Sequence, residues 1–169
     1  MITLSPDISD QARHWRNRNE VRSWCRQHTL LSRDEHKRWL DGLVNDKTVK
    51  MYGILSDGVE VGVCGFTSID LINRNAEFSL YIAPQLQRQG FGAAALNVLI
   101  NHGFLAFGFN RIWGETFEGN PAVKTFTKVG MVKEGTLRQS YFKQGKFINS
   151  HIYSILAQDF FATIKKADQ

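Results

Sequence analysis

The stretch that decides the fold is APQLQRQGFGAAAL, residues 83–96. A run of strand-forming residues, AEFSLYIA, precedes it, and its Ala- and Leu-rich end begins a run typical of a helix. Between them lie a proline, a Gln/Arg cluster and the glycines Gly90 and Gly92. The first turn of a helix carries unpaired backbone N–H groups, and glycine lets the backbone approach a ligand closely. This turn is therefore a candidate phosphate seat, although small residues that pack a strand against a helix would also explain it.

The composition is that of one globular domain spanning residues 1–169. Hydrophobic residues make up 43% and charged residues 22%, so we expect a buried core and no disorder. Cys25 and Cys64 form no ligand pattern, which favours reduced thiols in an intracellular protein. The opening MITLSPDISD has neither the basic nor the apolar region of a signal peptide, and no apolar run approaches a membrane span. We therefore expect a cytoplasmic protein with no membrane partner.

The formal net charge of +5 favours anionic partners. Nucleic acid, a phosphorylated small molecule and an acidic protein all fit this charge. The basic residues are scattered in twos and threes and form no tail, so the charge by itself does not choose among these partners.

Hydrophobic periodicity and turn signals predict a mixed α/β order, β-α-α-β-β-β-α-β-α-β-β. The second helix begins at a capping box made by Ser32 and Glu35. Asn120 and Pro121 are expected to begin the last helix, and Gly130 to end it. The expected strands are 2–4, 49–55, 59–69, 76–82, 111–117, 132–137 and 148–157, and the expected helices are 10–27, 32–44, 92–107 and 121–129.

The spacing of the glycine turn separates it from two common phosphate loops. No Gly-Lys-Ser/Thr follows, so it is not a Walker motif, and position 95 is Ala95 rather than the third glycine of a dinucleotide fingerprint. The pattern present is Gln87-x-x-Gly90-x-Gly92. It resembles the pyrophosphate loop of the GNAT (Gcn5-related) N-acetyltransferases, and the later segment FEGNPAVKTFTKVGMVKEGTLR is similar to the late helix, closing glycine and following strand of that family.

The resemblance covers nearly the whole chain and implies a particular sheet and cosubstrate. It implies a central, mostly antiparallel sheet with a splayed parallel strand pair and helices on both faces. It also implies that acetyl-CoA binds, without a metal, with its pantetheine arm between the strands at 77–82 and 111–117. The residues expected at the cofactor are Leu80, Tyr81, Ile82, Gln87, Arg88, Gln89, Gly90, Phe91, Gly92, Ala93, Asn120 and Phe126.

The catalytic residues follow from the same resemblance. An amine acceptor must lose a proton before it attacks, and Glu77 or Glu115 is the candidate base. The alternative is that either carboxylate merely pairs with a neighbour such as Arg74 or Arg111. The family's usual acid, a tyrosine, falls on Phe126 here. Either Tyr141 replaces it, or the thiolate leaves without a proton donor, as the pKa of a thiol, about 8.5, permits.

The N-terminal third is expected to shape the acceptor site, with Arg16, Arg22 and His36 as substrate-binding candidates. A solvated helix face over buried tryptophans is the alternative. The segment is similar to ribosomal-protein and antibiotic acetyltransferases and to enzymes that acetylate UDP-linked amino sugars. The leading hypothesis is therefore direct transfer, in a ternary complex, from acetyl-CoA to the primary amine of a UDP-linked amino sugar.

Other functions stay open at this stage. The acceptor could be a protein N-terminus, an antibiotic or a polyamine such as spermidine, although a cationic, aromatic entrance suits a polycation less well. A catalytically silent module that binds acyl-CoA or nucleic acid is the alternative of another class, with nucleic acid the less favoured partner. Members of the family often pair through their late strands, which leaves a homodimer open.

Overall fold

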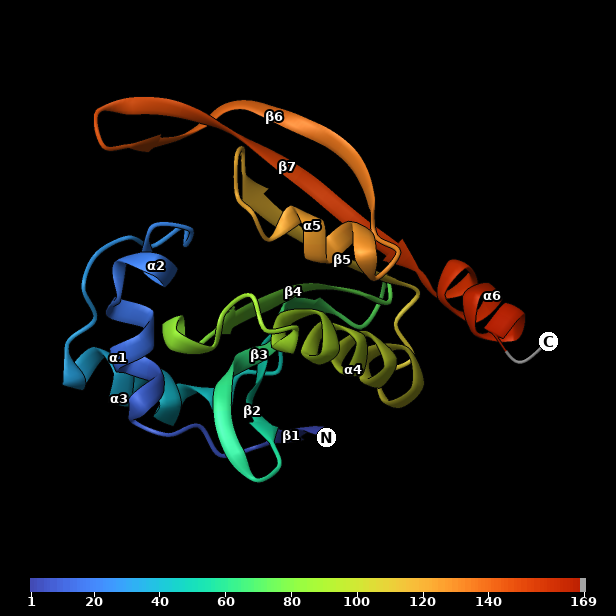
Figure 1. The fold of residues 1–169 in the computed structure, drawn as a ribbon, viewed down its shortest axis with the longest axis horizontal. Helices are drawn as coiled ribbons and strands as arrows, with labels where there is room; N and C mark the ends of the chain where they lie inside the picture. Colours follow the sequence, from blue (N-terminus) through green and yellow to red (C-terminus); the bar gives the residue numbers. More distant parts are fainter. Residues whose placement is uncertain (168–169) are drawn as a thin grey trace.

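The computed structural model describes residues 1–167, with side chains described through residue 163. Its strands form one mixed sheet in the order β1-β2-β3-β4-β5-β7-β6, antiparallel except for the pair β4–β5 (Figure 1). The strands are β1 Ile2–Ser5, β2 Lys50–Ser56, β3 Val59–Asp70, β4 Asn75–Ile82, β5 Arg111–Phe117, β6 Val132–Lys143 and β7 Lys146–Leu156. The predicted α/β class, with one parallel pair in a mostly antiparallel sheet, is confirmed.

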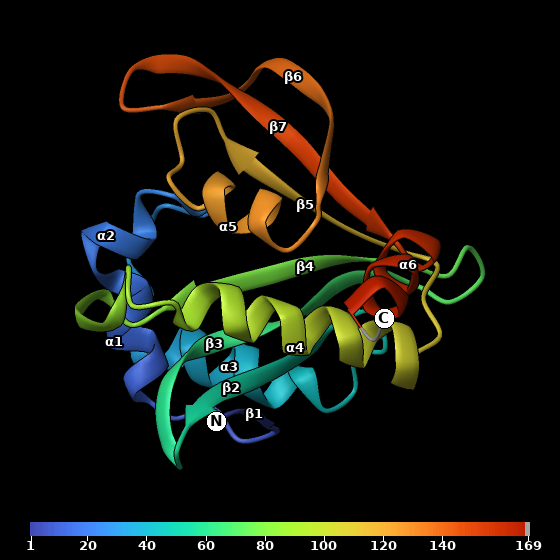
Figure 2. The same cartoon turned by 45° about the vertical axis from the view of Figure 1, so that its right-hand side comes forward.

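Helices cover both faces of the sheet, as Figure 2 shows for α4 and α3. Neighbouring residues of a strand point to opposite faces, and on β3 Cys64 belongs to the main core while Val63 belongs to a second, smaller core. Leu99 of α4 packs in the main core, and Trp15 of α1 packs in the second. The helices are α1 Gln11–Asn17, α2 Asn19–Arg22, α3 Arg33–Leu43, the 3-10 turn η1 Pro84–Leu86, α4 Phe91–Ala106, α5 Val123–Lys128 and α6 Ala157–Ala167.

The two parallel strands stay paired over only three positions. Asn75 lies opposite Arg111, and the pairing ends where Glu77 lies opposite Trp113. Beyond that point β4 pairs only with β3, and β5 only with β7. The ring of Phe78 lies against Gly114, where an added Cβ would come within 2.2 Å of it, so the glycine makes room for an aromatic ring at the point of divergence. The splay predicted between these strands is confirmed.

The helix expected over residues 10–27 is wrong in its length. Arg18 is extended, with φ −66° and ψ 142°, and divides the segment into α1 and α2. The side chain of Asn17 donates to the carbonyl of Leu31 and accepts from its N–H. This pairing joins residues far apart in the sequence, and the periodicity of hydrophobic residues in one helix cannot predict it.

The other boundaries agree more closely. The capping box of Ser32 and Glu35 is present, and Gly130, with φ +87°, follows the last residues of α5. That helix begins at Val123, later than expected, because Asn120 forms a local turn in which its Oδ1 accepts the N–H of Ala122. Helix α6 was not predicted at all; Phe160 of this helix packs against Phe104 of α4.

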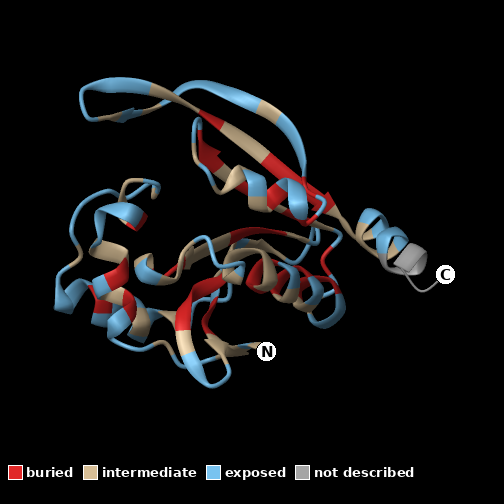
Figure 3. Cartoon of the chain, viewed as in Figure 1, coloured by how far each residue is buried: buried red, intermediate tan, exposed pale blue. Residues whose placement is uncertain are grey.

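Strands β6 and β7 form a long hairpin that extends away from the body toward α2 (Figure 1). Its end is largely exposed, whereas the buried residues follow the central strands (Figure 3). Lys143, near the tip, donates to the carbonyls of Ser23 and Cys25, so the hairpin is tied to the segment that follows α2. Among the residues described, no helix is long and apolar enough to cross a membrane.

Candidate functional site

The glycine turn leaves a row of backbone N–H groups without partners. Arg88 and Gly90 have positive φ, +63° and +91°, and Gly90 is the N-cap of α4. Ala94 donates the first helical hydrogen bond, to the carbonyl of Gly90 at 3.1 Å. No hydrogen bond among the described residues uses the N–H groups of residues 90–93 as donors. These groups lie at the positive end of a 16-residue helix, which is the arrangement that binds phosphate.

Two side chains of this turn hydrogen-bond to its own backbone, and a third is exposed between them. Gln87 donates to the carbonyl of Ile82 at 3.3 Å, and Gln89 donates to that of Gln85 at 3.1 Å. Both glutamines thus brace the turn. Arg88 is exposed and adds positive charge beside the free N–H groups. Phe91 and Ala93 complete the first helical turn and are half-buried.

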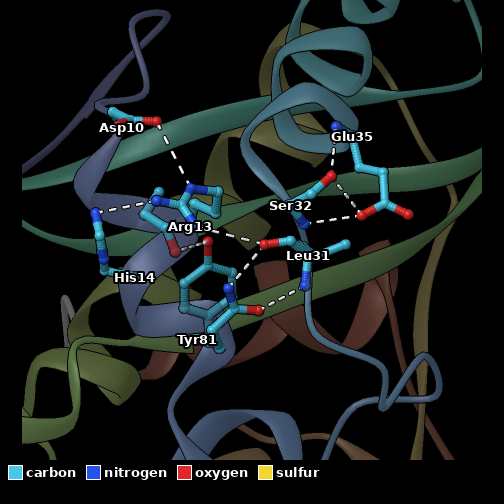
Figure 4. Close-up of polar contacts among 9 residues, drawn as sticks. Asp10, Arg13, His14, Leu31, Ser32, Glu35 and Tyr81 are labelled. Carbon is cyan, nitrogen blue, oxygen red and sulfur yellow. Dashed lines mark hydrogen bonds and ion pairs between the residues drawn. The ribbon is translucent and has the colours of Figure 1, made fainter.

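The unpaired edge of β4 leads directly into this turn. A Cβ at Gly92 would contact Ile82 at 3.7 Å and Leu80 at 3.9 Å, so these two side chains lie beside the start of α4. Tyr81 points to the opposite face, where its hydroxyl donates to the carbonyl of Ala12 at 3.3 Å (Figure 4). Burial raises the pKa of Tyr81, which keeps this phenol neutral. Leu80 and Ile82 are therefore placed to line the splay, whereas Tyr81 can contribute there only through its backbone.

Two buried carboxylates lie at the mouth of the splay. Glu77 ends the paired part of β4, and Oε1 of its carboxylate is 2.6 Å from Nη2 of Arg26. Its other oxygen accepts from the hydroxyl of Thr67 at 3.2 Å. Glu115 on β5 is 3.7 Å from Nη1 of the same arginine. Burial alone would lower the pKa of Arg26, but its hydrogen bond to Glu77 raises that pKa, so the guanidinium stays charged between the two acids.

Tyr141 joins this group from the hairpin. Its hydroxyl donates to Oε2 of Glu115 at 3.0 Å, and Ser150 donates to the other oxygen. Burial, and then the hydrogen bond to Glu115, raise the pKa of Tyr141. A phenol with a raised pKa keeps its proton and can act as a donor. We call Arg26, Glu77, Glu115 and Tyr141 the carboxylate cluster.

The structure thus brings together the three residues expected to be catalytic, from β4, β5 and β6. The pairing expected as the alternative is different in detail, because Arg111 pairs with Glu134 and Glu77 pairs with Arg26. Arg26 belongs to the N-terminal third expected to shape the acceptor site, but its contact with the carboxylates was not predicted. It lies 51 positions before Glu77 in the chain, and no local pattern links the two.

The substrate-binding candidates do not form one group. Arg22 lines a cavity of about 190 Å³ between α2 and the hairpin tip, together with Asn19, Ser23, His28, Lys143 and Gln144. Arg16 donates to the carbonyl of Gln27 at 2.6 Å. His36 is buried on α3, stacks on Trp39 at 5.5 Å, and has no described contact with either arginine. A larger cavity of about 560 Å³ lies beside η1 and is lined by Gln11, His14, Trp15, Arg18, Glu20, Pro84 and Gln85.

Asn120 and Phe126 have contacts of their own within the chain. The amide of Asn120 donates to the hydroxyl of Thr116 at 2.7 Å. Phe126 is buried between Phe78 and Tyr153, with ring centroids at 5.2 and 5.6 Å. Their contact with a pantetheine arm stays a prediction. No group of His, Cys, Asp or Glu side chains in the described part of the chain could hold a metal ion.

Comparison with known proteins gives consistent findings. A family model described as an acetyltransferase (GNAT) domain matches residues 2–132. The chain is 33% identical over 97 residues to the uncharacterized N-acetyltransferase YoaA of Bacillus subtilis, an alignment that covers 57% of this chain and 55% of that protein. It is 27% identical over 134 residues to spermidine N(1)-acetyltransferase of Vibrio cholerae, covering 78% and 76%.

A solved structure has the same fold. The crystal structure of spermidine N-acetyltransferase from Vibrio cholerae, in complex with CoA and spermine, superposes with a TM-score of 0.88. The alignment covers 95% of this chain and 98% of that one, at 22% sequence identity. At this identity the likeness concerns the fold and not the acceptor.

The burial of His36 predicts a pH dependence of stability. Burial lowers the pKa of His36 below its ordinary value of 6.5. Below pH 6.5 the unfolded chain binds a proton at His36 more readily than the folded chain does. The contribution of neutral His36 to the free energy of unfolding is therefore complete above pH 6.5 and is lost as the pH falls through the folded pKa. We expect His36→Leu to flatten the fall in melting temperature between about pH 7 and 5. An equal pH dependence in His36→Leu and wild type would contradict this, and His28→Leu, at an exposed position, is the control.

Proposed function

Since the chain belongs to the acetyltransferase (GNAT) family, we propose that it transfers the acetyl group of acetyl-CoA to a primary amine. One observation supports the proposal: β4 carries Glu77 of the carboxylate cluster where its pairing with β5 ends, then an edge that β5 leaves unpaired, and then the free N–H groups of the glycine turn. An anion seat, a slot for a linear arm and a proton acceptor are the three things that this reaction needs.

The residues present fit acetyl-CoA, which supplies an activated thioester. The N–H groups of residues 90–93 would hold its pyrophosphate, with Arg88 adding charge. Backbone groups of residues 80–82, which pair with β3 on one side only, would hold the pantetheine arm. An N–H in this stretch would also polarise the thioester carbonyl.

Proton transfer is assigned to the carboxylate cluster. Glu77 is the proposed base, because it lies where the strands part and is almost completely buried. Glu115 is the second candidate and would take the proton directly or through water. Tyr141, which keeps its proton, would protonate the departing thiolate in place of the family's usual tyrosine.

The favoured acceptor is an amino sugar linked to a nucleotide. The lining of the cavity between α2 and the hairpin tip includes Arg22 and Lys143, and such a cationic wall suits a diphosphate. The second candidate acceptor is a polyamine. It is favoured by the 27% identity to spermidine N(1)-acetyltransferase, although the same cationic wall would repel a polycation.

The glycine turn can be tested through cofactor binding. Gly90→Ala places a side chain at φ +91°, which strains the turn and moves its N–H groups. We expect the affinity for acetyl-CoA to fall by about tenfold, measured as a smaller rise in melting temperature on adding the ligand. Gly58→Ala is the matched control, because Gly58 also has positive φ and open space around it but lies in the β2–β3 turn. An equal rise in melting temperature on adding acetyl-CoA to the two variants would argue against binding of the pyrophosphate at the glycine turn.

Release of free thiol from acetyl-CoA tests the reaction and the acceptor together. The acceptors are a UDP-linked 4-amino sugar, spermidine, a ribosomal N-terminal peptide and an aminoglycoside. We expect turnover with the amino sugar, since its diphosphate matches the cationic cavity. Turnover with spermidine alone would favour the second candidate. Binding of acetyl-CoA without turnover on any acceptor would contradict the enzyme and favour a silent binding module.

The base can be tested separately. Glu77→Gln keeps the shape of the side chain but cannot take a proton, so we expect kcat to fall by about a hundredfold while the KM for acetyl-CoA stays unchanged. Glu35→Gln is the control, since glutamine also serves in a capping box. A larger loss in Glu115→Gln than in Glu77→Gln would reassign the base to Glu115.

A further inference from the structure

Arg26 holds an unusual place among the charges of the site. The side chains of Glu77 and Glu115 are only 4% and 9% exposed, and the guanidinium of Arg26 reaches both, at 2.6 and 3.7 Å. Buried carboxylates need a compensating cation, because the free energy of removing them from water is large. Half of the Arg26 side chain is exposed, so this cation is supplied from the open side of the site, where an acceptor would enter.

A second cation, Lys143, binds the backbone that directly precedes Arg26. Lys143 donates to the backbone carbonyls of Ser23 and Cys25, and its ammonium lies 4.6 Å from the ring centre of Phe117. These contacts tie the segment carrying Arg26 to the β6–β7 hairpin. The positive charge at the carboxylates is therefore set by packing between distant parts of the chain and does not depend on a mobile side chain alone.

On the basis of the proposed function, we propose that Arg26 determines acceptor specificity by taking the place that a second ammonium group of a polycationic acceptor would need. A polyamine carries several ammonium groups, and two buried carboxylates would be a natural site for them. Because Arg26 already lies between the carboxylates, their negative charge is compensated and attracts a further ammonium group less strongly. Arg26 thus selects amines whose remaining part is neutral or anionic, and refuses polycations.

This role is separate from that of the cationic cavity. Arg22 and His28 line the cavity between α2 and the hairpin tip, whereas Arg26 contacts the carboxylates themselves. An arginine that merely stabilised the fold would affect every ligand equally. A specificity residue changes the ratio between a polycation and an anion.

Binding measurements test this without requiring turnover. Calorimetry with spermidine and with UDP, in the presence of CoA, compares the wild type with Arg26→Gln and Arg26→Lys. We expect Arg26→Gln to bind spermidine at least about tenfold more tightly than the wild type. UDP should bind both proteins, and Arg26→Lys, which keeps the charge, should retain the wild-type ratio of the two affinities.

Each other outcome counts against the role. Unchanged spermidine affinity in Arg26→Gln would overturn it, as would a wild type that already prefers spermidine to UDP. A gain in Arg26→Lys equal to that in Arg26→Gln would show that shape and not charge is decisive. Arg33→Gln, an exposed arginine at the start of α3, is the matched control. If no acceptor were acetylated, the proposed function would be wrong. The affinities for spermidine and UDP would still decide the role of Arg26.

Discussion

The loss of pairing between β4 and β5 after Glu77 and Trp113 is the constraint on which the rest of the site depends. A buried strand edge normally has its backbone groups satisfied by a neighbouring strand. Here β4 runs on to Ile82 with a partner on one side only, and the glycine turn follows at once. Glu77 on β4 and Glu115 on β5 lie at this divergence, and the guanidinium of Arg26 is near both. Phe78 fills part of the gap against Gly114, so the strands part around a ring rather than around an empty space.

The charges near Glu77 and Glu115 bear on the choice of acceptor more directly than the fold does. The fold is shared with a spermidine N-acetyltransferase at a TM-score of 0.88. A shared fold does not carry a shared substrate, because the acceptor is selected by the side chains around the site. In this chain Arg26 pairs with the carboxylates, Lys143 of the hairpin binds the segment that follows α2, and Arg22 and Lys143 line a cavity there. Experiments with both kinds of amine therefore decide between the candidate acceptors.

Features that depend on neighbouring residues were predicted well. The capping box of Ser32 and Glu35 and the glycine turn arise from interactions within a few positions, and the strand over residues 111–117 is indicated by its own residue types although its pairing is long-range. The prediction of one helix over residues 10–27 was wrong, because Asn17 pairs with Leu31. Helix α6 was not predicted, although Phe160 of this helix packs against Phe104 of α4. His36 looked like a substrate contact, but it lies buried against Trp39. Helical spacing places residues on one face without telling whether that face meets solvent or core.

The sequence by itself determined the α/β class, the family resemblance and the position of the glycine turn before α4, since each is encoded in short-range spacing and element order. Only the tertiary structure decided which groups meet at the opening. Arg26 reaches Glu77 across 51 positions, and Tyr141 reaches Glu115 across 26. Such contacts arise from the packing of α2, the central strands and the hairpin around one another. Long-range ion pairs and hydrogen bonds of this kind produce no periodic pattern in the sequence.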